Sequence, residues 1–488
     1  MNIAVNLEID KDEFETFSEA EEFCYATGLR VAREMMKRIL EVLDAEQLAE
    51  RDAGRYRCKG FSKTCLKTMM GDVEYRRRVY IDTATEEGKH CVYLLDKSLQ
   101  VKTVGQVTEN ACRAAALNVC EGTYRAAAQQ MRGEGLVLSH QAIWNIVQAL
   151  GRRQRSLTER KAELAKLGVG TGTVETKLLY EEADGIWLKL QGKSRVENGP
   201  SKEMKIGIAY DGVLWELTGD SRKRWKLDNK VALAGFYSAE EFRAYDDGVI
   251  AGKFKTATIL LRVVNGDGAQ WIQKRKGVNM ICVLDEYHRN RKITECAGNP
   301  EFAQTIRTLL CEKKTEDALV CIQAQINSIE DEDQQEKLRD LYRYFHQNKD
   351  ALLGYYDRGI EIPATREPGV VHHARLGSME SNVYTLIGNR MKGGRATWSI
   401  DGANNLALLL CAYHTSGLKE LFPNLPPLPE SCVEERPEID RRKPLSASRT
   451  PLKEGRGSEY AKDVSTTNSP AFLRGISQFS SLSSMSFC

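Results

Sequence analysis

The stretch ILLRVVNGDGAQ, residues 259–270, decides how the fold is interpreted, because it joins a strongly apolar run to an aspartate between two glycines. The apolar run predicts a buried strand. Gly266 and Gly268 carry no side chains, so a phosphate or another backbone segment can approach Asp267 closely. We therefore expect a central strand that ends at a functional carboxylate.

The segments around this stretch predict the element order of a ribonuclease H-like fold. Three strand-like runs precede it and are expected to form an antiparallel meander: KLLYEEADGIWLKL (177–190), EMKIGIAYDGVLWEL (203–217) and RWKLDNKVALAGFY (224–237). A helix over 239–249 comes next, and VNMICVLD at 278–285 is a further strand. This order puts Asp184, in the first strand, and Asp267 on adjacent central strands, where their carboxylates can share metal ions.

A third carboxylate, Glu380, occurs late in the chain. Residues 289–370 predict an all-helical insertion, and the following segment LGSMESNVYTLIGNRMKGG (376–394) carries Glu380 on an expected helix. Spacing alone does not select three residues among 68 acids, and each aspartate taken singly is more often structural. Context selects them instead, since Asp184 lies in a strand interior where a charge is otherwise unfavourable.

Three such carboxylates suit phosphodiester cleavage and transfer. That chemistry creates negative charge on the attacking and leaving oxygens, and two divalent ions about 4 Å apart stabilise both. Carboxylate oxygens are ligands that Mg²⁺ prefers, so we expect two Mg²⁺ ions, with Mn²⁺ as a substitute. The scarcity of zinc-like Cys and His spacings argues against catalytic zinc.

Residues 107–150 predict three short helices in a helix-turn-helix arrangement. Ser139 is the expected N-cap of the last one, which would present His140, Gln141 and Asn145 at the start of a recognition helix. The alternative is an ordinary three-helix core. In both cases a set of apolar residues is expected to be buried: Ile143, Trp144, Ile146 and Val147.

Two basic clusters lie on either side of these helices. The first comprises Arg51, Arg55, Arg57, Lys59, Lys63, Lys67, Arg76, Arg77 and Arg78. The second lies on a basic helix expected over 151–166 and comprises Arg152, Arg153, Arg155, Arg160 and Lys161. Each cluster is either a DNA-binding surface or a merely solvated face.

The 488 residues indicate an α+β multidomain protein. We expect a helical region with a small hairpin around Gly71-Asp72 over 1–100, and the helix-turn-helix region with its basic helix over 101–167. The catalytic domain, with a mixed sheet, is expected over 173–425. The proline-rich and then Ser/Thr-rich remainder, 426–488, is expected to be disordered.

Composition limits the cellular setting. No stretch is apolar enough to span a membrane, and the acidic start of the chain does not resemble a secretory signal, so a cytoplasmic protein is expected. Thirteen cysteines without a C-x-x-C pair are expected to be reduced and mostly buried. The net charge of +2 gives no indication of a nucleic-acid partner.

Taken together, several motifs resemble the transposases of the ISLre group of bacterial insertion sequences, long catalogued as an uncharacterised family, and more distantly the Mutator-like transposases. The resemblance covers roughly residues 10–420. The motifs that carry it are Glu182-Ala183-Asp184-Gly185, Gly266-Asp267-Gly268-Ala269-Gln270-Trp271-Ile272, Leu284-Asp285-Glu286-Tyr287-His288, and Glu380 with Asn389-Arg390-Met391-Lys392 and Trp398-Ser399.

The resemblance implies that Asp184, Asp267 and Glu380 are the metal-binding triad. They are 267 − 184 = 83 and 380 − 267 = 113 positions apart, and the second interval is long enough for the helical insertion that Mutator-like enzymes have there.

The same resemblance suggests roles for further residues near the triad. Asp285 and His288 match an accompanying Asp-x-x-His, with His288 either contacting phosphate or structural. Arg390 and Lys392 look like phosphate contacts. Trp398 either stacks on a base or, the interpretation that we favour, fills the core.

The activity implied is cleavage at transposon ends by water, followed by attack of the freed 3′ hydroxyl on target DNA. The implied partners are double-stranded DNA, as terminal repeats and target, and further copies of the chain, because two ends must be brought together. No membrane or small-molecule cofactor is expected, and the site of action is the nucleoid of a bacterial cytoplasm. The alternatives are an inactive or domesticated copy that only binds DNA, and a ribonuclease H-fold nuclease that cuts without joining.

Overall fold

The computed structural model describes all residues except 1–13, 85–89, 218–222, 274–276, 278 and 424–488. The predicted disordered tail, 426–488, lies outside the described residues. The described part has helices and mixed sheets, as expected for an α+β protein. None of the described helices is long and apolar enough to cross a membrane.

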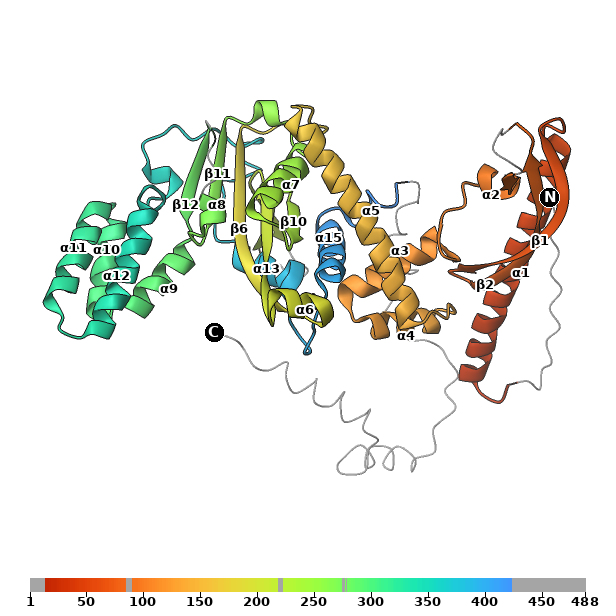
Figure 1. The fold of residues 1–488 in the computed structure, drawn as a ribbon, viewed down its shortest axis with the longest axis horizontal. Helices are drawn as coiled ribbons and strands as arrows, with labels where there is room; N and C mark the ends of the chain where they lie inside the picture. The colour runs from red at the N-terminus through yellow and green to blue at the C-terminus, as the bar shows by residue number, and fades with distance from the viewer. Residues whose placement is uncertain (1–13, 85–89, 218–222, 274–276, 278, 424–488) are drawn as a thin grey trace, which may run out of the picture. The chain divides into compact units, whose positions relative to one another are not determined.

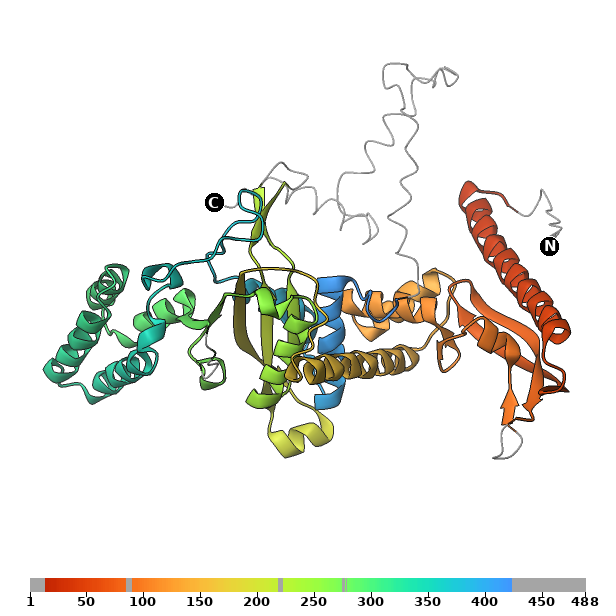
Figure 2. The same cartoon turned by 90° about the horizontal axis from the view of Figure 1, so that it is seen from above.

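The N-terminal part consists of one long helix beside a five-stranded sheet (Figure 2). Its elements are α1 (Phe17–Glu50), β1 (Tyr56–Thr68), β2 (Gly71–Asp82), β3 (His90–Val92), α2 (Leu94–Ser98), β4 (Thr103–Val104) and β5 (Val107–Thr108). The predicted hairpin is confirmed, but Thr68 pairs with Gly71, so the turn residues are Met69 and Met70 rather than Gly71-Asp72. Gly71 has φ +101°, which only glycine adopts easily, and it follows the turn directly.

Three helices follow: α3 (Glu109–Glu121), α4 (Tyr124–Gly133) and α5 (His140–Lys166). Ser139 is the N-cap of α5 as predicted, and its hydroxyl accepts a 3.1 Å hydrogen bond from the Ala142 backbone N–H. The last predicted helix and the basic segment were expected separately but form one helix of 27 residues. Gly151 lies within it because α15 crosses there, and an added Cβ would lie 2.3 Å from the Asn405 Cβ.

One burial prediction for α5 is wrong. Ile143, Ile146 and Val147 are buried, but Trp144 is 39% exposed. Helical geometry explains this, because consecutive residues point about 100° apart and Trp144 faces away from the buried stripe.

The central sheet has the strand order β10-β7-β6-β11-β12, and β6, β11 and β12 are parallel neighbours (Figure 1). Its strands are β6 (Leu178–Lys189), β7 (Ser201–Tyr210), β10 (Val231–Gly235), β11 (Leu261–Gly266) and β12 (Met280–Leu284). The strand pairs β10–β7 and β7–β6 are antiparallel. As predicted, Asp184 and Asp267 are carried by adjacent central strands.

The predicted three-strand meander needs a correction, because its second and third runs each divide into two strands. The end of the second run and the start of the third form a separate hairpin of β8 (Val213–Leu217) and β9 (Lys223–Leu227). Both runs break at residues with positive φ, Gly212 at +154° and Asn229 at +49°. These conformations are unfavourable within a strand, so the chain leaves the sheet there.

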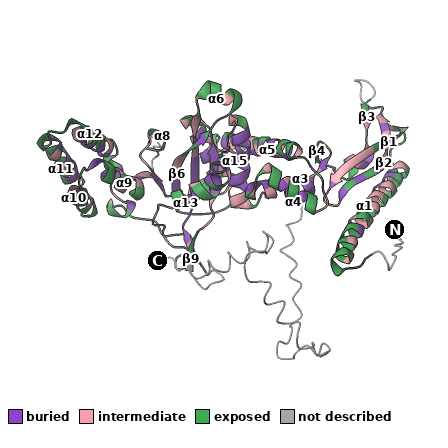
Figure 3. Cartoon of the chain, turned by 90° about the horizontal axis from the view of Figure 1, so that it is seen from below, coloured by how far each residue is buried: buried purple, intermediate pink, exposed green. Residues whose placement is uncertain are grey.

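The helix α5 packs against α7 (Ala239–Ala251) and α15 (Ile400–Ser416), and these two pack against β10 of the sheet. Figure 3 shows α15 as almost wholly buried, and residues 402–412 along it are all buried. One hydrophobic cluster runs from α3–α5 through the sheet to α15, so these helices share their core with the sheet. Remaining short elements are α6 (Gly192–Asn198), a 3₁₀ turn (Thr256–Thr258) and α8 (Gln270–Gln273).

The segment after β12 forms the expected helical insertion. Its helices are α9 (Glu286–Cys296), α10 (Pro300–Cys311), α11 (Thr315–Ser328) and α12 (Glu332–Gln347), which enclose a hydrophobic cluster of their own. Over residues 348–370 there are only 3₁₀ turns, at Lys349–Ala351 and Tyr355–Asp357. The helical prediction therefore fails for most of 348–370, where Pro363, Pro368 and several glycines interrupt the chain.

Candidate active site

Three aspartates lie at the same level of three neighbouring parallel strands, Asp184 within β6 and Asp267 and Asp285 directly after β11 and β12. Gly266, the last residue of β11, pairs with Ala183 on β6 and with Leu284 on β12. The next residues along the three segments are Asp184, Asp267 and Asp285. Since parallel strands keep the same direction, the three carboxylates start from the same level at one edge of the sheet.

Glu380 joins these aspartates from a segment far along the chain. It lies on α13 (Met379–Val383), which continues through a π-helical turn (Tyr384–Gly388) into α14 (Asn389–Met391). A small cleft, here called the carboxylate cleft, is lined by Ala183, Asp184, Asn265, Gly266, Asp267, Asp285, Tyr287, His288, Gly377, Met379 and Glu380. All three predicted triad residues therefore border one cleft.

The environment of Asp184 concentrates negative charge. Burial is the largest influence and raises the pKa of its carboxyl. The negative charges of Asp267 and Asp285 act in the same direction. A 2.7 Å hydrogen bond from the Gly185 backbone N–H and the charge of His288 act in the opposite direction.

Asp285 and His288 form a pair at the start of α9. Asp285 caps this helix, accepting a 3.1 Å hydrogen bond from the His288 backbone N–H, and the same oxygen lies 3.1 Å from the His288 Nδ1. This contact raises the pKa of His288 against the effect of burial. Burial opposes ionisation of Asp285, but its hydrogen bonds outweigh burial and lower its pKa. Both a structural and a charge-contacting role fit this geometry.

The donor set of the carboxylate cleft suits a hard divalent cation, because every acidic ligand offers carboxylate oxygens. The crowding of Asp184, Asp267 and Asp285 would be relieved by positive charge in the cleft. Within the described ranges, however, no three His, Cys, Asp or Glu side chains are gathered closely enough to hold an ion as they are placed. Metal binding would therefore need these side chains to rearrange, and Glu380 is the exposed acid among them.

Glu182 is a site residue that sequence reasoning missed. It is 1% exposed, it precedes Ala183 on β6, and it does not itself line the cleft. It accepts hydrogen bonds from the Tyr210 hydroxyl (2.6 Å), the Asn265 amide (3.0 Å), and the backbone N–H groups of Gly377 (2.8 Å) and Ser378 (3.3 Å). A charged residue inside an apolar strand was the only sequence signal for it.

Asn265 extends this network to Asp285. Its amide donates to Glu182 and, at 3.0 Å, to Asp285. Asn265 is 2% exposed and lies on β11 between those two carboxylates. The network thus ties β6, β11 and the start of α9 to the segment that leads into α13.

The helical insertion supports the Asp267 turn. The Asp267 carboxylate accepts a 2.8 Å hydrogen bond from the Ala269 N–H, and its carbonyl accepts one of 2.7 Å from the Tyr344 hydroxyl on α12. Gly268 has φ +92°, and an added Cβ would lie 2.8 Å from the Tyr344 ring. Glycine is therefore required at this position both by its backbone conformation and by this close approach.

The other residues expected near the triad lie elsewhere. The Arg390 guanidinium donates a 2.8 Å hydrogen bond to the Val119 carbonyl and packs between the rings of Tyr124 and Trp398. It is not among the residues that line the cleft. Lys392 is exposed, and Trp398 is buried with its indole N–H bonded to a backbone carbonyl, as the core interpretation requires.

The residues expected to read DNA are on the surface of α5. His140, Gln141 and Asn145 are exposed, and the Gln141 amide is 3.5 Å from the Asn145 side-chain oxygen. Arg152 and Arg153 are also exposed, and Arg153 forms a 3.7 Å ion pair with Glu109. A concave surface between α4 and the start of α5 is lined by Arg125, Ala128, Gln129, Arg132, Leu138, Ser139 and His140.

The first basic cluster divides into structural and exposed members. Arg55, Arg78 and Lys67 form ion pairs within the N-terminal part, with Asp82, Asp44 and Asp72 respectively. Four members are exposed and form no ion pair with any residue that the structure describes: Arg57, Lys59, Lys63 and Arg76.

Comparison with known proteins gives a family, a relative within it and weak structural likenesses. The Drosophila P element transposase strand transfer complex is 8% identical, covering 65% of this chain and 83% of that chain with a TM-score of 0.19, and a likeness at this level carries no argument. A relative from Streptococcus gallolyticus, described as the UPF0236 protein in vanSb 3'region, is 25% identical over 419 residues, 83% of this chain and 84% of the relative. The profile of the uncharacterised protein family UPF0236 matches residues 11–420. The chain therefore belongs to the uncharacterised protein family UPF0236.

Proposed function

We propose that the protein is the DNA transposase of a bacterial insertion sequence of the ISLre group, with Asp184, Asp267 and Glu380 as its catalytic triad. The observation that carries the proposal is that these carboxylates, from segments 83 and 113 positions apart, line the same cleft. If each acid had only a structural role, the three carboxylates would not need to line the same cleft. The motif resemblance to ISLre-group and Mutator-like transposases supports the same triad.

The topology of the central sheet supports a ribonuclease H-like catalytic domain. Such a domain has three antiparallel strands, the first of which also pairs in parallel with a fourth strand, and the fourth with a fifth. The order β10-β7-β6-β11-β12 follows this scheme, with β6 as the first strand. The insertion α9–α12 follows the fifth strand and precedes Glu380, which agrees with the Mutator-like arrangement.

In the proposed reaction, Asp184, Asp267 and Glu380 would hold Mg²⁺, with Mn²⁺ as a substitute. The ions, two by analogy with other phosphoryl-transfer sites, would stabilise charge on the attacking and leaving oxygens. Water first attacks the phosphorus at the transposon end, breaking the bond to the 3′ oxygen and freeing a 3′ hydroxyl. That hydroxyl then attacks a target phosphorus, forming one phosphodiester bond as another breaks.

Residues around the triad have supporting roles in this proposal. His288, positively charged when protonated, faces the phosphate in the cleft, while Asp285 fixes its ring through the 3.1 Å contact. Glu182 and Asn265 hold the segment before Glu380 against the strands that carry the aspartates. Tyr344 fixes the Asp267 turn.

We assign end recognition to the helices α3–α5, interpreted as a helix-turn-helix. The exposed side chains of His140, Gln141 and Asn145 at the start of α5 are suited to base edges. Arg125 and Arg132, on the adjoining concave surface, are suited to phosphates. The exposed cations of the N-terminal hairpin would add contacts along the duplex. The proposal implies action on the bacterial nucleoid and assembly of two or more copies on paired ends.

The test is incubation of the full-length protein with DNA that carries the terminal repeats of its element, in Mg²⁺, Mn²⁺ or EDTA. The proposal expects nicked, excised and joined products with either metal and none in EDTA. Cutting without joined products would indicate a nuclease of the same fold. Binding without cutting in either metal would contradict the proposal and indicate a copy that acts only by binding DNA.

A further inference from the structure

An open cavity of about 860 Å³ shares a wall with the carboxylate cleft, and its volume is within the range of small-molecule sites. Its walls come from the β8–β9 hairpin, the turn into β10, the end of α15 and the segment before α13. Leu376, Ser378, Ser381 and Asn382 line this cavity, whereas Gly377, Met379 and Glu380 of the same segment line the cleft. One stretch of chain therefore separates the two.

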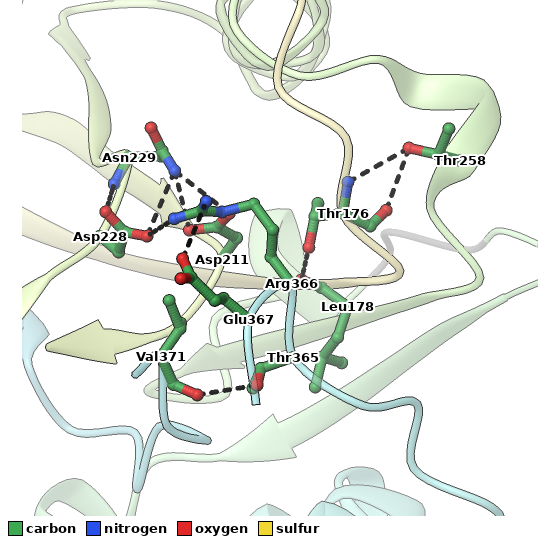
Figure 4. Close-up of polar contacts among 10 residues, drawn as sticks. All are labelled: Thr176, Leu178, Asp211, Asp228, Asn229, Thr258, Thr365, Arg366, Glu367 and Val371. Atoms are coloured by element: carbon green, nitrogen blue, oxygen red, sulfur yellow. Dashed lines mark hydrogen bonds and ion pairs between the residues drawn. The ribbon is translucent and has the colours of Figure 1, made fainter. Parts of the chain in front are cut away.

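The cavity wall is strongly cationic. Its basic residues are Arg224, Lys226, Lys230, Lys253 and Arg375, with His373 and His414 nearby. Asp228, the one acid among the described residues that line it, is already engaged: the Arg366 guanidinium lies 2.6 Å from it and the Asn229 amide 3.3 Å (Figure 4). Such an excess of positive charge attracts anions.

Lys230 gives the clearest indication that the cavity binds an anion. Its side chain is half-buried, burial lowers its pKa, and its ammonium donates a 3.1 Å hydrogen bond to the Asn382 side-chain oxygen. Among the described residues it has no carboxylate partner, and neither do Lys253 and Arg375. Holding an ammonium partly out of water without a counter-ion is costly, so a bound anion would stabilise it.

An aromatic surface faces the same cavity. Trp225 lines it and is 49% exposed, and its ring contacts that of Trp215, which is 47% exposed, with centroids 3.4 Å apart and planes tilted by 31°. Exposed tryptophans on a strand hairpin are unusual, because burying an indole is favourable. A flat ring that lines a cationic cavity is suited to a nucleobase, since bases stack on aromatic side chains while basic residues bind the backbone.

We propose that this cavity binds an unpaired nucleotide of the DNA strand that enters the carboxylate cleft, with its phosphate at Lys230 and Arg375 and its base on Trp225. This inference rests on the proposed function. Residues 376–382 form the wall that the cavity and the cleft share. A strand with one phosphate beside Glu380 would therefore place its neighbouring nucleotide on the other side of this wall. The cavity then fixes the strand beside the cleft without contributing a reacting group.

The test measures binding without cleavage. Full-length protein in EDTA is titrated with fluorescein-labelled DNA that is blunt or carries a short single-stranded overhang, both with the same duplex. Anisotropy gives affinity, and tryptophan fluorescence reports stacking. The proposal expects the overhang DNA to bind roughly tenfold more tightly and to quench tryptophan fluorescence.

Variants assign that preference to the cavity. Lys230→Met and Arg375→Gln should each remove most of the overhang advantage and lower the salt dependence by about one phosphate contact. Trp225→Leu should remove the quenching. The matched controls, Lys193→Met and Trp187→Leu, change exposed residues outside the cavity, 88% and 60% exposed, and should keep both signals. Thermal melting of each variant separates loss of binding from loss of folding.

Several outcomes would overturn the inference. One is equal affinity for blunt and overhang DNA. Another is an overhang advantage that survives in folded Lys230→Met and Trp225→Leu proteins. Quenching by adenosine monophosphate without any overhang preference would indicate a free-nucleotide site instead. Because these assays contain no metal, they are independent of cutting: if the wild type cuts and joins in Mg²⁺ but shows no overhang preference, only this inference fails.

Discussion

The buried carboxylate of Glu182 accepts a 2.8 Å hydrogen bond from the backbone N–H of Gly377, which joins the first strand of the central sheet to the segment that carries Glu380. The two residues are 195 positions apart in the chain. The strand β6 therefore carries Asp184 and, through this bond, holds the segment that leads to Glu380. The proposed catalytic acids are thus positioned by a fourth acid that does not line their cleft.

Glu182→Gln tests this positioning role. An amide has only one acceptor oxygen, so its NH₂ group must face at least one of the N–H donors that Glu182 now binds. We expect a loss of about 1–3 kcal/mol in unfolding free energy, and strand cleavage reduced well beyond that of the control Glu197→Gln on α6. Binding to terminal-repeat DNA should persist. Unchanged cleavage in a folded Glu182→Gln protein would contradict the role.

Tyr344→Phe removes the hydroxyl that binds the Asp267 carbonyl and leaves the ring over Gly268. The Asp267 turn should loosen, at a cost of about 0.5–1.5 kcal/mol, and cleavage should fall several-fold with end binding unchanged. Tyr342→Phe is the matched control, because Tyr342 lies on the same helix but its ring stacks on His346, away from the Asp267 carbonyl that Tyr344 binds. Equal cleavage by the two variants would show that the insertion does not support the site.

Arg390→Gln distinguishes a structural arginine from a phosphate contact. The structure has its guanidinium bonded to Val119 between two aromatic rings, so the substitution should lower the unfolding free energy by about 1–3 kcal/mol. Lys392→Gln, at an exposed position two residues later, should leave stability unchanged. If Arg390→Gln melts like the wild type but cuts DNA poorly, the phosphate interpretation from the sequence is correct after all.

The double substitution Gln141→Ala and Asn145→Ala tests DNA reading by α5. Both side chains are exposed, so the melting temperature should hold while the preference for terminal-repeat over unrelated DNA falls by an order of magnitude or more. The chain offers a close control on α11, where Gln323 and Asn327 form a similar exposed pair at 3.4 Å. A preserved sequence preference would assign end recognition to another surface.

Local patterns account for what the sequence predicted correctly. Two acids could be predicted on neighbouring strands, because strand pairing follows from the order of elements. The evidence for them was the apolar run before Gly266-Asp267-Gly268 and the strand pattern around Asp184. Ser139 was recognisable because a cap depends on residues adjacent in sequence.

Long-range contacts account for what was missed. Glu182 is explained by Tyr210, Asn265 and Gly377, none of which is near it in the sequence. Arg390 was expected beside the site because of its neighbours, but its partner Val119 lies 271 positions away. The glycine at position 151, in the middle of α5, is explained by its close contact with Asn405 on α15. A periodic pattern in the sequence of one helix cannot predict such a contact.

The most direct test of the central claim is cleavage of terminal-repeat DNA in Mg²⁺ by Asp184→Asn, Asp267→Asn and Glu380→Gln proteins. The control is Glu286→Gln, which changes an exposed acid next to the cleft that does not line it. Our account predicts that each triad variant binds the ends like the wild type but yields no nicked or joined product, while the control stays active. Detectable cleavage by a triad variant, above all Asp267→Asn, would contradict the assignment.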